Sequence, residues 1–318
     1  MPKGPMTLGV DLGGTNIQAG LLGPDNKLIT RDSTKTKADE GAEKVLSRIV
    51  KLCDGILDEA KVSKGDVAGL GIGAPGALDI ENGVVREAVN LRWRDFPLAK
   101  KLGELVGMPV LIDNDVNVGA WGEYHAGAGK TGQDMLAVFV GTGIGGGLIL
   151  NGKLMHGHFG TAGEIGHTTI SAHSSIGRRT VENLASRNSM VLLLAKLIGA
   201  NHSSSLVEAT GGDLSKIRSK ILAQAVKQED PLTLEVVSHA AEIVGISIAN
   251  TVTLLSLPQV VVGGGVTEAL GNAWMKRITD AFERHVFPHE LRDCKIMASK
   301  LGDDAGVIGA ALLARDIP

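Results

Sequence analysis

Residues 6–22 read MTLGVDLGGTNIQAGLL, and residues 135–150 read MLAVFVGTGIGGGLIL. Each stretch is an apolar run, a glycine turn and a second apolar run, which predicts two strands joined by a tight bend. The two stretches begin about 130 residues apart, and each opens a region in which strand and helix patterns alternate. The sequence therefore predicts two similar α/β domains that face each other across a cleft.

Apolar periodicity predicts the remaining elements and a domain boundary. The boundary is expected in the small and polar residues from Tyr124 to Gln133. We expect strands at 27–33, 67–72, 110–112, 148–150 and 259–262, helices at 40–60, 96–106, 116–125 and 305–315, and helical patterns over much of 180–255.

The composition indicates a globular protein without a strong net charge. Apolar residues make up 43% and charged residues 21% of the 318 residues, and the net charge of -3 gives no basic field for nucleic acid or an acidic membrane. Stretches such as Thr251 to Leu257 are too short to span a bilayer, and Met1 to Met6 contain no apolar signal segment. Cys53 and Cys294 are distant from each other and form neither a disulfide framework nor a metal pattern, so we expect a cytoplasmic protein.

The first glycine turn has the residue types of a phosphate cradle. Gly13 and Gly14 leave backbone N–H groups bare, and Thr15 adds a hydroxyl. Asp11 beside them could hold Mg²⁺ through water, because Mg²⁺ takes few carboxylates and keeps several waters. A plain glycine hairpin is the alternative. The second turn, with Thr142 between two glycines, favours the phosphate interpretation, since two opposed turns suit one polyphosphate between two domains.

Asp113-Asn114-Asp115 follows a predicted strand and precedes a predicted helix. Asp115 is either the N-cap of that helix or a general base that accepts a hydroxyl proton and orients the hydroxyl for phosphoryl transfer. Asp113 and Asp115 are, as a third possibility, a metal pair.

Glu164 and His167 are three residues apart and could present polar groups to one ligand. Sugar hydroxyls need such donor and acceptor partners, because a site built for each hydroxyl rejects analogues that lack it. A structural histidine is the alternative for His167. His156 and His158 are expected in a surface loop.

Together these residues resemble the ROK family of sugar kinases within the actin-like ATPase fold. The resemblance covers nearly the whole chain, and the order of its motifs is far more specific than any single motif. Ala120 to Tyr124 and Asn90 to Trp93 look most like the bacterial glucokinases of the group. The matching motifs are Asp11 to Thr15, Gly73 to Gly76, Asn90 to Trp93, Asn114 to Asn117, Gly141 to Gly147, Gly163 to His167, Gly263 to Val266 and Asp304 to Gly309.

The resemblance implies a domain organisation and a set of site residues. It implies two actin-like (ribonuclease H-like) α/β domains with mixed sheets: a small one of residues 1–123 plus 304–318, to which the last helix returns, and a large one of residues 124–303. Asp115 would be the catalytic base. Contacts with the sugar would come from Asp115 and from Gly76, Asn114, Glu164, His167 and Glu182. The nucleotide would be held by Gly13, Gly14, Thr15, Asn16, Gly141, Thr142, Gly143, Gly264 and Gly265, with Mg²⁺ at Asp11.

The chain departs from the family in one segment. Many members bind a structural zinc through a histidine and three cysteines between the Glu-x-x-His motif and the later glutamate. Residues 168–181 contain no cysteine, so a zinc site of that type cannot form here. His173 alone does not make a closed site, and we expect no structural zinc and another means of ordering this loop.

The expected activity is transfer of the γ-phosphate of ATP to the 6-hydroxyl of glucose, in a homo-oligomer (dimer or tetramer) that binds no nucleic acid or membrane. Alternatives within the family are N-acetylmannosamine, N-acetylglucosamine or fructose as acceptor and polyphosphate as donor. A different class is a non-catalytic sugar-binding regulator. A DNA-binding member would carry a helix-turn-helix module before the first glycine turn, where only ten residues precede Asp11.

Overall fold

The computed structural model describes residues 5–129 and 131–317, which divide into two compact units. The first unit contains the described residues up to Gly132, then Gly147–Ala162, and those from Asp303 onward, whereas the second contains Gln133–Gly146 and Gly163–Gly302. The grouping of Gly147–Ala162 with the first unit was not anticipated from the sequence. The predicted domain limits themselves stay a prediction.

Two five-stranded mixed sheets share one strand order. The first runs β3-β2-β1-β4-β8 and the second runs β11-β10-β9-β12-β13. If the five strands of each sheet are numbered in chain order, both sheets have the spatial order 3-2-1-4-5. The repeat visible in the sequence therefore extends to the topology of the sheets. The predicted pair of similar α/β units with mixed sheets is confirmed, and their arrangement across a cleft stays a prediction.

The first unit combines its sheet with helices and a small three-stranded sheet, β5-β6-β7. The strand β1 is antiparallel to β2 and parallel to β4, which in turn is parallel to β8. The elements are β1 (Met6–Leu12), β2 (Asn16–Leu22), β3 (Leu28–Lys35), α1 (Ala42–Ala60), β4 (Val67–Ala74), β5 (Ala77–Asp79), β6 (Val84–Ala88), β7 (Trp93–Phe96), α2 (Leu98–Val106), β8 (Val110–Asn114), α3 (Asp115–Ala126) and α10 (Ala305–Leu313).

The second sheet carries the remaining helices. Its strand β10 begins at Ile144 rather than at Leu148 as predicted, because the glycines after Ile144 lie in the strand and not in the bend. A Cβ on Gly146 would come 2.7 Å from the carbonyl oxygen of Gly163, so close approach explains this glycine. The elements are β9 (Met135–Val140), β10 (Ile144–Leu150), β11 (Lys153–Leu154), α4 (Val181–Ala185), α5 (Arg187–Gly199), α6 (Leu206–Ala209), α7 (Ser219–Lys227), α8 (Pro231–Leu255), β12 (Gln259–Gly263), α9 (Gly265–His285) and β13 (Lys295–Ala298).

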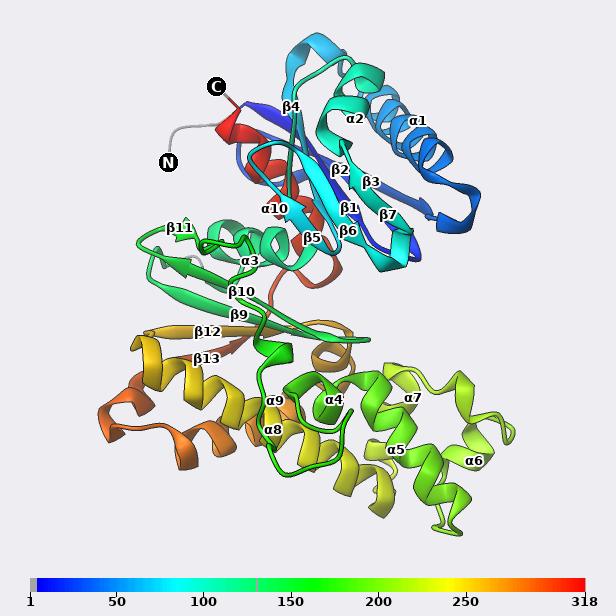
Figure 1. Ribbon diagram of the computed structural model, residues 1–318, viewed down its shortest axis with the longest axis vertical. Helices are drawn as coiled ribbons and strands as arrows, with labels where there is room; N and C mark the ends of the chain where they lie inside the picture. The colour runs from blue at the N-terminus through cyan, green and yellow to red at the C-terminus, as the bar shows by residue number, and fades with distance from the viewer. Residues whose placement is uncertain (1–4, 130, 318) are drawn as a thin grey trace. The chain divides into compact units, whose positions relative to one another are not determined.

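The two faces of β1 pack against different helices, because successive side chains of a strand point to opposite sides. Leu8 and Val10 are fully buried in a core cluster that also contains Leu46 and Ile49 of α1. Gly9 lies between them and faces α10 on the other side of the sheet. Figure 1 draws α1 and α10 on opposite sides of β1.

The approach of α10 to the sheet depends on residues without side chains. A Cβ on Gly71 of β4 would overlap the carbonyl oxygen of Ala310, and a Cβ on Gly309 would overlap that of Val118 in α3. Glycine at these positions lets α10 pack directly on backbone, with the sheet on one side and α3 on the other.

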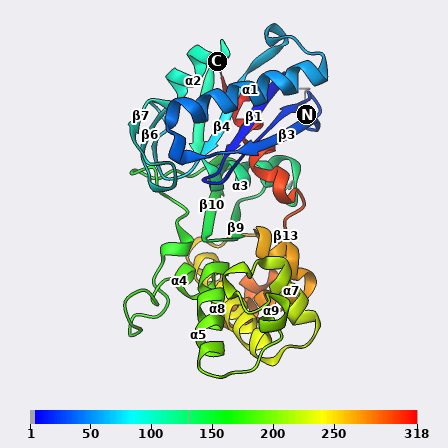
Figure 2. The ribbon, with the colours of Figure 1, turned by 90° about the vertical axis from the view of Figure 1, so that its right-hand side faces the viewer.

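One described helix, α8, is long and apolar enough by length and composition to cross a membrane, which the sequence-based reading of shorter apolar stretches overlooked. In an apolar stretch of 18 residues of this helix, 67% is buried inside the protein. It lies side by side with α9 in both views (Figures 1 and 2). Burial to this extent is typical of a helix in the core of a folded protein.

Replacement of Gly71 by alanine tests the packing of α10. We expect Gly71→Ala to lower the free energy of unfolding by about 3 kcal/mol or more, since the backbone of α10 must move to admit the methyl group. Gly55 of α1 is the matched control, because no atom lies within 4 Å of a Cβ built there. Gly55→Ala should raise the stability by about 0.5–1 kcal/mol. Equal effects of the two substitutions in urea unfolding would contradict this packing.

Candidate functional site

The first glycine turn joins β1 to β2 and is fastened to the following strand. The N–H of Gly13 donates to the carbonyl oxygen of Asn16 at 3.0 Å. The hydroxyl of Thr36 donates to the carbonyl oxygen of Gly13 at 2.6 Å, and the N–H of Thr36 donates to that of Thr15 at 2.9 Å. Thr15 and Asn16 are exposed at the tip of the turn, where a ligand can reach them.

Asp11 lies at the end of β1 among other carboxylates of the first unit. Its carboxylate packs against Gly306 of α10, where an added Cβ would lie 2.5 Å from Oδ2. Burial and the neighbouring charges of Asp115 and Asp303 raise the pKa of Asp11 to about 7. A cation bound beside Asp11 would favour its charged form and lower this pKa.

The carboxylate of Asp11 fits a magnesium ion that arrives with phosphates. Mg²⁺ is commonly held by one or two carboxylates, waters and substrate phosphates. Within the described residues, no group of three or more His, Cys, Asp or Glu side chains is arranged to hold a metal ion. The predicted absence of a structural zinc stays a prediction.

The strand-to-helix junction corrects one of the sequence-based alternatives. The N-cap of α3 is Asn114, whose Oδ1 accepts hydrogen bonds from the N–H groups of Val116 at 2.9 Å and Asn117 at 3.3 Å. The interpretation of Asp115 as the N-cap is therefore wrong. Asp115 is the first residue of α3, and its carboxylate is close enough to Asp11 to raise the pKa of Asp11.

Asp113 is fully buried and bound by protein donors. Its Oδ1 accepts from the N–H of Asn114 at 2.7 Å and from Nδ2 of Asn117 at 3.0 Å. Its Oδ2 lies 2.7 Å from Nε2 of His156. Since both oxygens are engaged, the interpretation of Asp113 and Asp115 as a metal pair is not supported.

His156 lies in a loop, as expected, but it is not fully exposed. Its side chain is 33% exposed and paired with Asp113, and this hydrogen bond raises the pKa of His156. His158, two residues on, is exposed as expected. The two partners are 43 positions apart, so no local spacing could have revealed the pair.

The second glycine turn, Gly141–Gly143, is stabilised from two helices of the second unit. The N–H of Gly141 donates to the carbonyl oxygen of Gly143 at 2.9 Å. Oε2 of Glu182 in α4 accepts from the N–H of Ile144 at 2.9 Å. Arg187 at the start of α5 donates from Nη2 to the hydroxyl of Thr142 at 2.6 Å, a contact that was not predicted.

Three residues of the second unit were predicted to contact the sugar, and two of them, Glu164 and His167, lie close to each other. Nε2 of His167 lies 3.8 Å from Oε2 of Glu164, and both side chains are more than half exposed. Their predicted proximity is thus present. Glu182 instead binds the glycine turn, where its Oε2 accepts from the N–H of Ile144.

Gly264, the N-cap of α9, lies next to β9, where a Cβ added to it would come 2.6 Å from the carbonyl oxygen of Val140. The predicted nucleotide motif of Gly264 and Gly265 therefore adjoins the second glycine turn. Gly76 belongs to the first unit, and its φ of 97° is in the region that favours glycine.

Hydrogen bonds order the cysteine-free segment of residues 168–181. Thr169 and Thr180 form an isolated antiparallel bridge. The N–H of Ile170 donates to the carbonyl oxygen of Arg179 at 2.8 Å, and the hydroxyls of Ser171 and Ser174 lie 2.6 Å apart. These contacts join the two ends of the loop.

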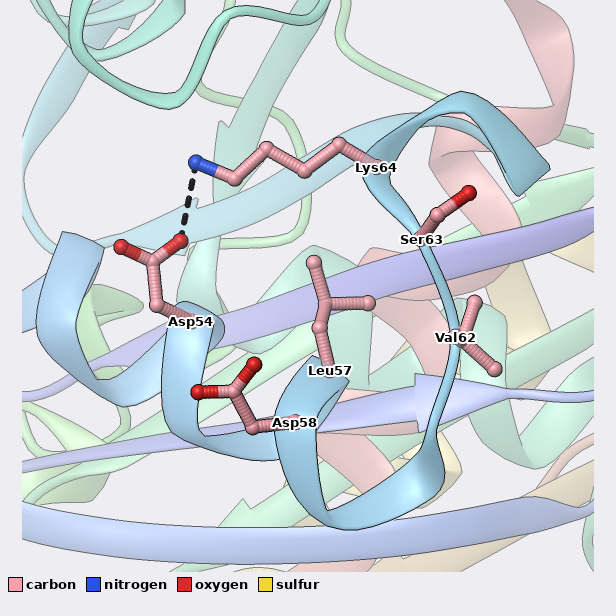
Figure 3. A pocket seen from close by; sticks show the side chains of 6 residues that line it. All are labelled: Asp54, Leu57, Asp58, Val62, Ser63 and Lys64. Carbon is pink, nitrogen blue, oxygen red and sulfur yellow. Dashed lines mark ion pairs between the residues drawn. The ribbon is translucent and has the colours of Figure 1, made fainter.

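A hollow of about 390 Å³ lies at the end of α1, and none of the predicted site residues lines it. Asp54, Asp58, Ser63 and Lys64 contribute its polar side chains (Figure 3). Nζ of Lys64 forms an ion pair with Asp54 at 2.9 Å across it. Its charges are already paired in part, and it brings together no group with a role in phosphoryl transfer.

Replacement of His156 tests its pair with Asp113. A raised pKa means that the pair stabilises the fold fully below pH about 6 and that this contribution is lost as pH rises through the folded-state pKa. We expect His156→Gln to lower the free energy of unfolding by about 1 kcal/mol or less at pH about 5.5, since solvent screens the pair, and by less at pH about 9. Urea unfolding at the two pH values measures this. In the control, His158→Gln should change the free energy of unfolding by an equally small amount at both pH values. If His156→Gln lowered the free energy of unfolding by the same amount at both pH values, the charged pair would be contradicted.

Comparisons with known proteins agree with these features. The model of the ROK family matches residues 7–317. The glucokinase of Halalkalibacterium halodurans is 34% identical, with 97% of this chain and 94% of that protein covered. The glucokinase of Thermotoga maritima is 32% identical, with 99% of each chain covered.

A solved structure extends the likeness from sequence to fold. The crystal structure of a ROK family glucokinase from Streptomyces griseus in complex with glucose and AMPPNP has a TM-score of 0.84 and 32% identity, and it covers 98% of this chain and 99% of its own. The predicted actin-like ATPase fold is confirmed by this match. The chain belongs to the ROK family.

Proposed function

We propose that the chain is an ATP-dependent hexose kinase that transfers the γ-phosphate of ATP to the 6-hydroxyl of glucose. The observation that carries the proposal is the proximity of Asp115 to Asp11. Gly73 of β4 pairs with Asp11 of β1, and a Cβ added to Gly73 would lie 3.2 Å from the Cα of Asp115. The charge of Asp115 accordingly contributes to the raised pKa of Asp11. Asp115, the base for the acceptor hydroxyl, and Asp11, the carboxylate for the donor's cation, are then neighbours in the first unit. The matches to glucokinases support glucose as the acceptor.

Phosphoryl transfer requires positioning and charge stabilisation rather than covalent help from the protein. Asp115 accepts the proton of the 6-hydroxyl as its oxygen attacks the γ-phosphorus in line, and the bond to the β-phosphate oxygen breaks to release ADP. Magnesium at Asp11 would supply neutralisation of the phosphate charge.

The other predicted residues orient the two substrates. Asn114 caps α3 through Oδ1 and offers its amide nitrogen to the sugar. Gly76 would approach the sugar through its backbone, while Glu164, His167 and Glu182 would bind its hydroxyls. The nucleotide would be held at the two glycine turns and at Gly264 and Gly265.

The cellular setting is proposed on separate grounds. Cys53 and Cys294 are buried free thiols, and burial raises their pKa to about 12 and about 11, respectively, so both are unreactive. Neither needs an oxidising compartment, and we propose a cytoplasmic homo-oligomer, dimer or tetramer.

Replacement of Asp115 by asparagine tests the catalytic base. Asp115→Asn should lower kcat for glucose phosphorylation by about 10²–10⁴-fold, because the amide cannot accept the hydroxyl proton. Glucose binding, measured by calorimetry, should persist. The control is Asp58→Asn in the hollow at the end of α1 (Figure 3), which should leave turnover unchanged. Near-normal turnover of Asp115→Asn would remove Asp115 as the base.

A further inference from the structure

Arg187 is held directly at the tip of the second glycine turn. Its Nη2 donates to the exposed hydroxyl of Thr142 at 2.6 Å, and its backbone N–H donates to the carbonyl oxygen of Gly141 at 3.0 Å. It is the first residue of α5, whose N-cap Ser186 accepts from the N–H of Ser189 at 3.2 Å. Both the backbone and the guanidinium of Arg187 are thus fixed beside the turn.

A second arginine lies near it, at the start of α7. Arg218 is the N-cap of that helix, and its Nη1 donates to the carbonyl oxygens of Ser215 at 2.7 Å and Ile217 at 3.1 Å. Burial and the positive charge of Arg218 lower the pKa of Arg187. The residue after Arg218 is Ser219, whose hydroxyl would lie 3.9 Å from a Cβ on Gly265.

Among the described residues, neither arginine forms an ion pair, and the carboxylate of Glu182 binds the turn through the N–H of Ile144 instead. Both guanidinium groups bind neutral oxygens, one a hydroxyl and the other carbonyl groups, so their positive charges remain. Placing two like charges near each other costs free energy, which an anion between or beside them would offset. A side chain that only stabilised the glycine turn would need no more than a neutral hydrogen-bond donor to the hydroxyl of Thr142. A negatively charged ligand would use both arginines.

We propose that Arg187, assisted by Arg218, binds the phosphate chain of the phosphoryl donor at the second glycine turn. A guanidinium has five N–H donors, so Arg187 can keep its bond to Thr142 and still bind phosphate oxygens. Gly264, beside Val140, and Gly265, beside Ser219, place the predicted nucleotide motif next to both arginines. The identification of this ligand as the phosphoryl donor rests on the proposed kinase function. The presence of an anion site at the two arginines does not depend on that function.

The recognised chemistry is a linear phosphate chain, which ATP and inorganic polyphosphate share. The test is calorimetric titration of the full chain with magnesium-ATP and, separately, with inorganic tripolyphosphate. Arg187→Gln should weaken both by about tenfold or more, as expected for loss of a charge-assisted contact. Arg218→Gln should weaken both by a smaller factor. An effect on ATP alone would assign the site to the nucleotide, and an effect on both would assign it to the phosphate chain.

The control removes the same charge from the other end of α5. Lys196→Gln should bind both ligands as the wild type does, because Lys196 is exposed in the last turn, beyond the screening length from Arg187. Arg187→Lys should recover part of the lost affinity, because it restores the positive charge that Arg187→Gln removes. Unchanged thermal unfolding and glucose affinity in Arg187→Gln would show that the fold is intact.

The outcomes separate this inference from the proposed function. Wild-type affinity of Arg187→Gln for both ligands, or no binding of either by the wild type, overturns the inference. If the wild type phosphorylates no hexose while Arg187→Gln loses affinity for tripolyphosphate, the kinase proposal fails and the anion site stands.

Discussion

The contact between α10 and the backbone of β1, β4 and α3 holds the first unit together. Because glycine occupies the contact points, the last helix lies directly against strands that are far away in the chain. The same contact places Gly306 against Asp11 and brings Asp303 within electrostatic range of it. The acidic character of the site thus follows from how closely one helix can pack.

Each unit contains a group of charged side chains near its glycine turn. The first unit gathers the carboxylates of Asp11, Asp115 and Asp303, which suit proton acceptance and a cation. The second gathers Arg187 and Arg218 beside bare-backbone turns, which suit phosphate oxygens. A phosphoryl-transfer enzyme needs both environments, since the acceptor hydroxyl must lose a proton while the donor's charge is stabilised.

Much of the fold could be predicted from the sequence, because the repeat at 6–22 and 135–150 is local and periodic. The glycine run after Ile144 was assigned to the bend, since a sequence does not distinguish a glycine needed for a turn from one needed for close approach. The site was predictable only where its residues are neighbours in the chain. Asn114 and Asp115 were identified together, although which of them caps α3 depends on the direction of a side chain. His156 and Arg187 were missed because their partners lie 43 and 45 positions away.

The most direct measurement is phosphorus NMR of the wild-type protein mixed with magnesium-ATP and one sugar at a time, from glucose, fructose, N-acetylmannosamine and N-acetylglucosamine. With glucose, we expect glucose 6-phosphate to accumulate together with an equal amount of ADP, and no inorganic phosphate in the absence of sugar. Absence of any sugar phosphate with all four sugars, or release of inorganic phosphate in its place, would contradict the assignment of the chain as a hexose kinase.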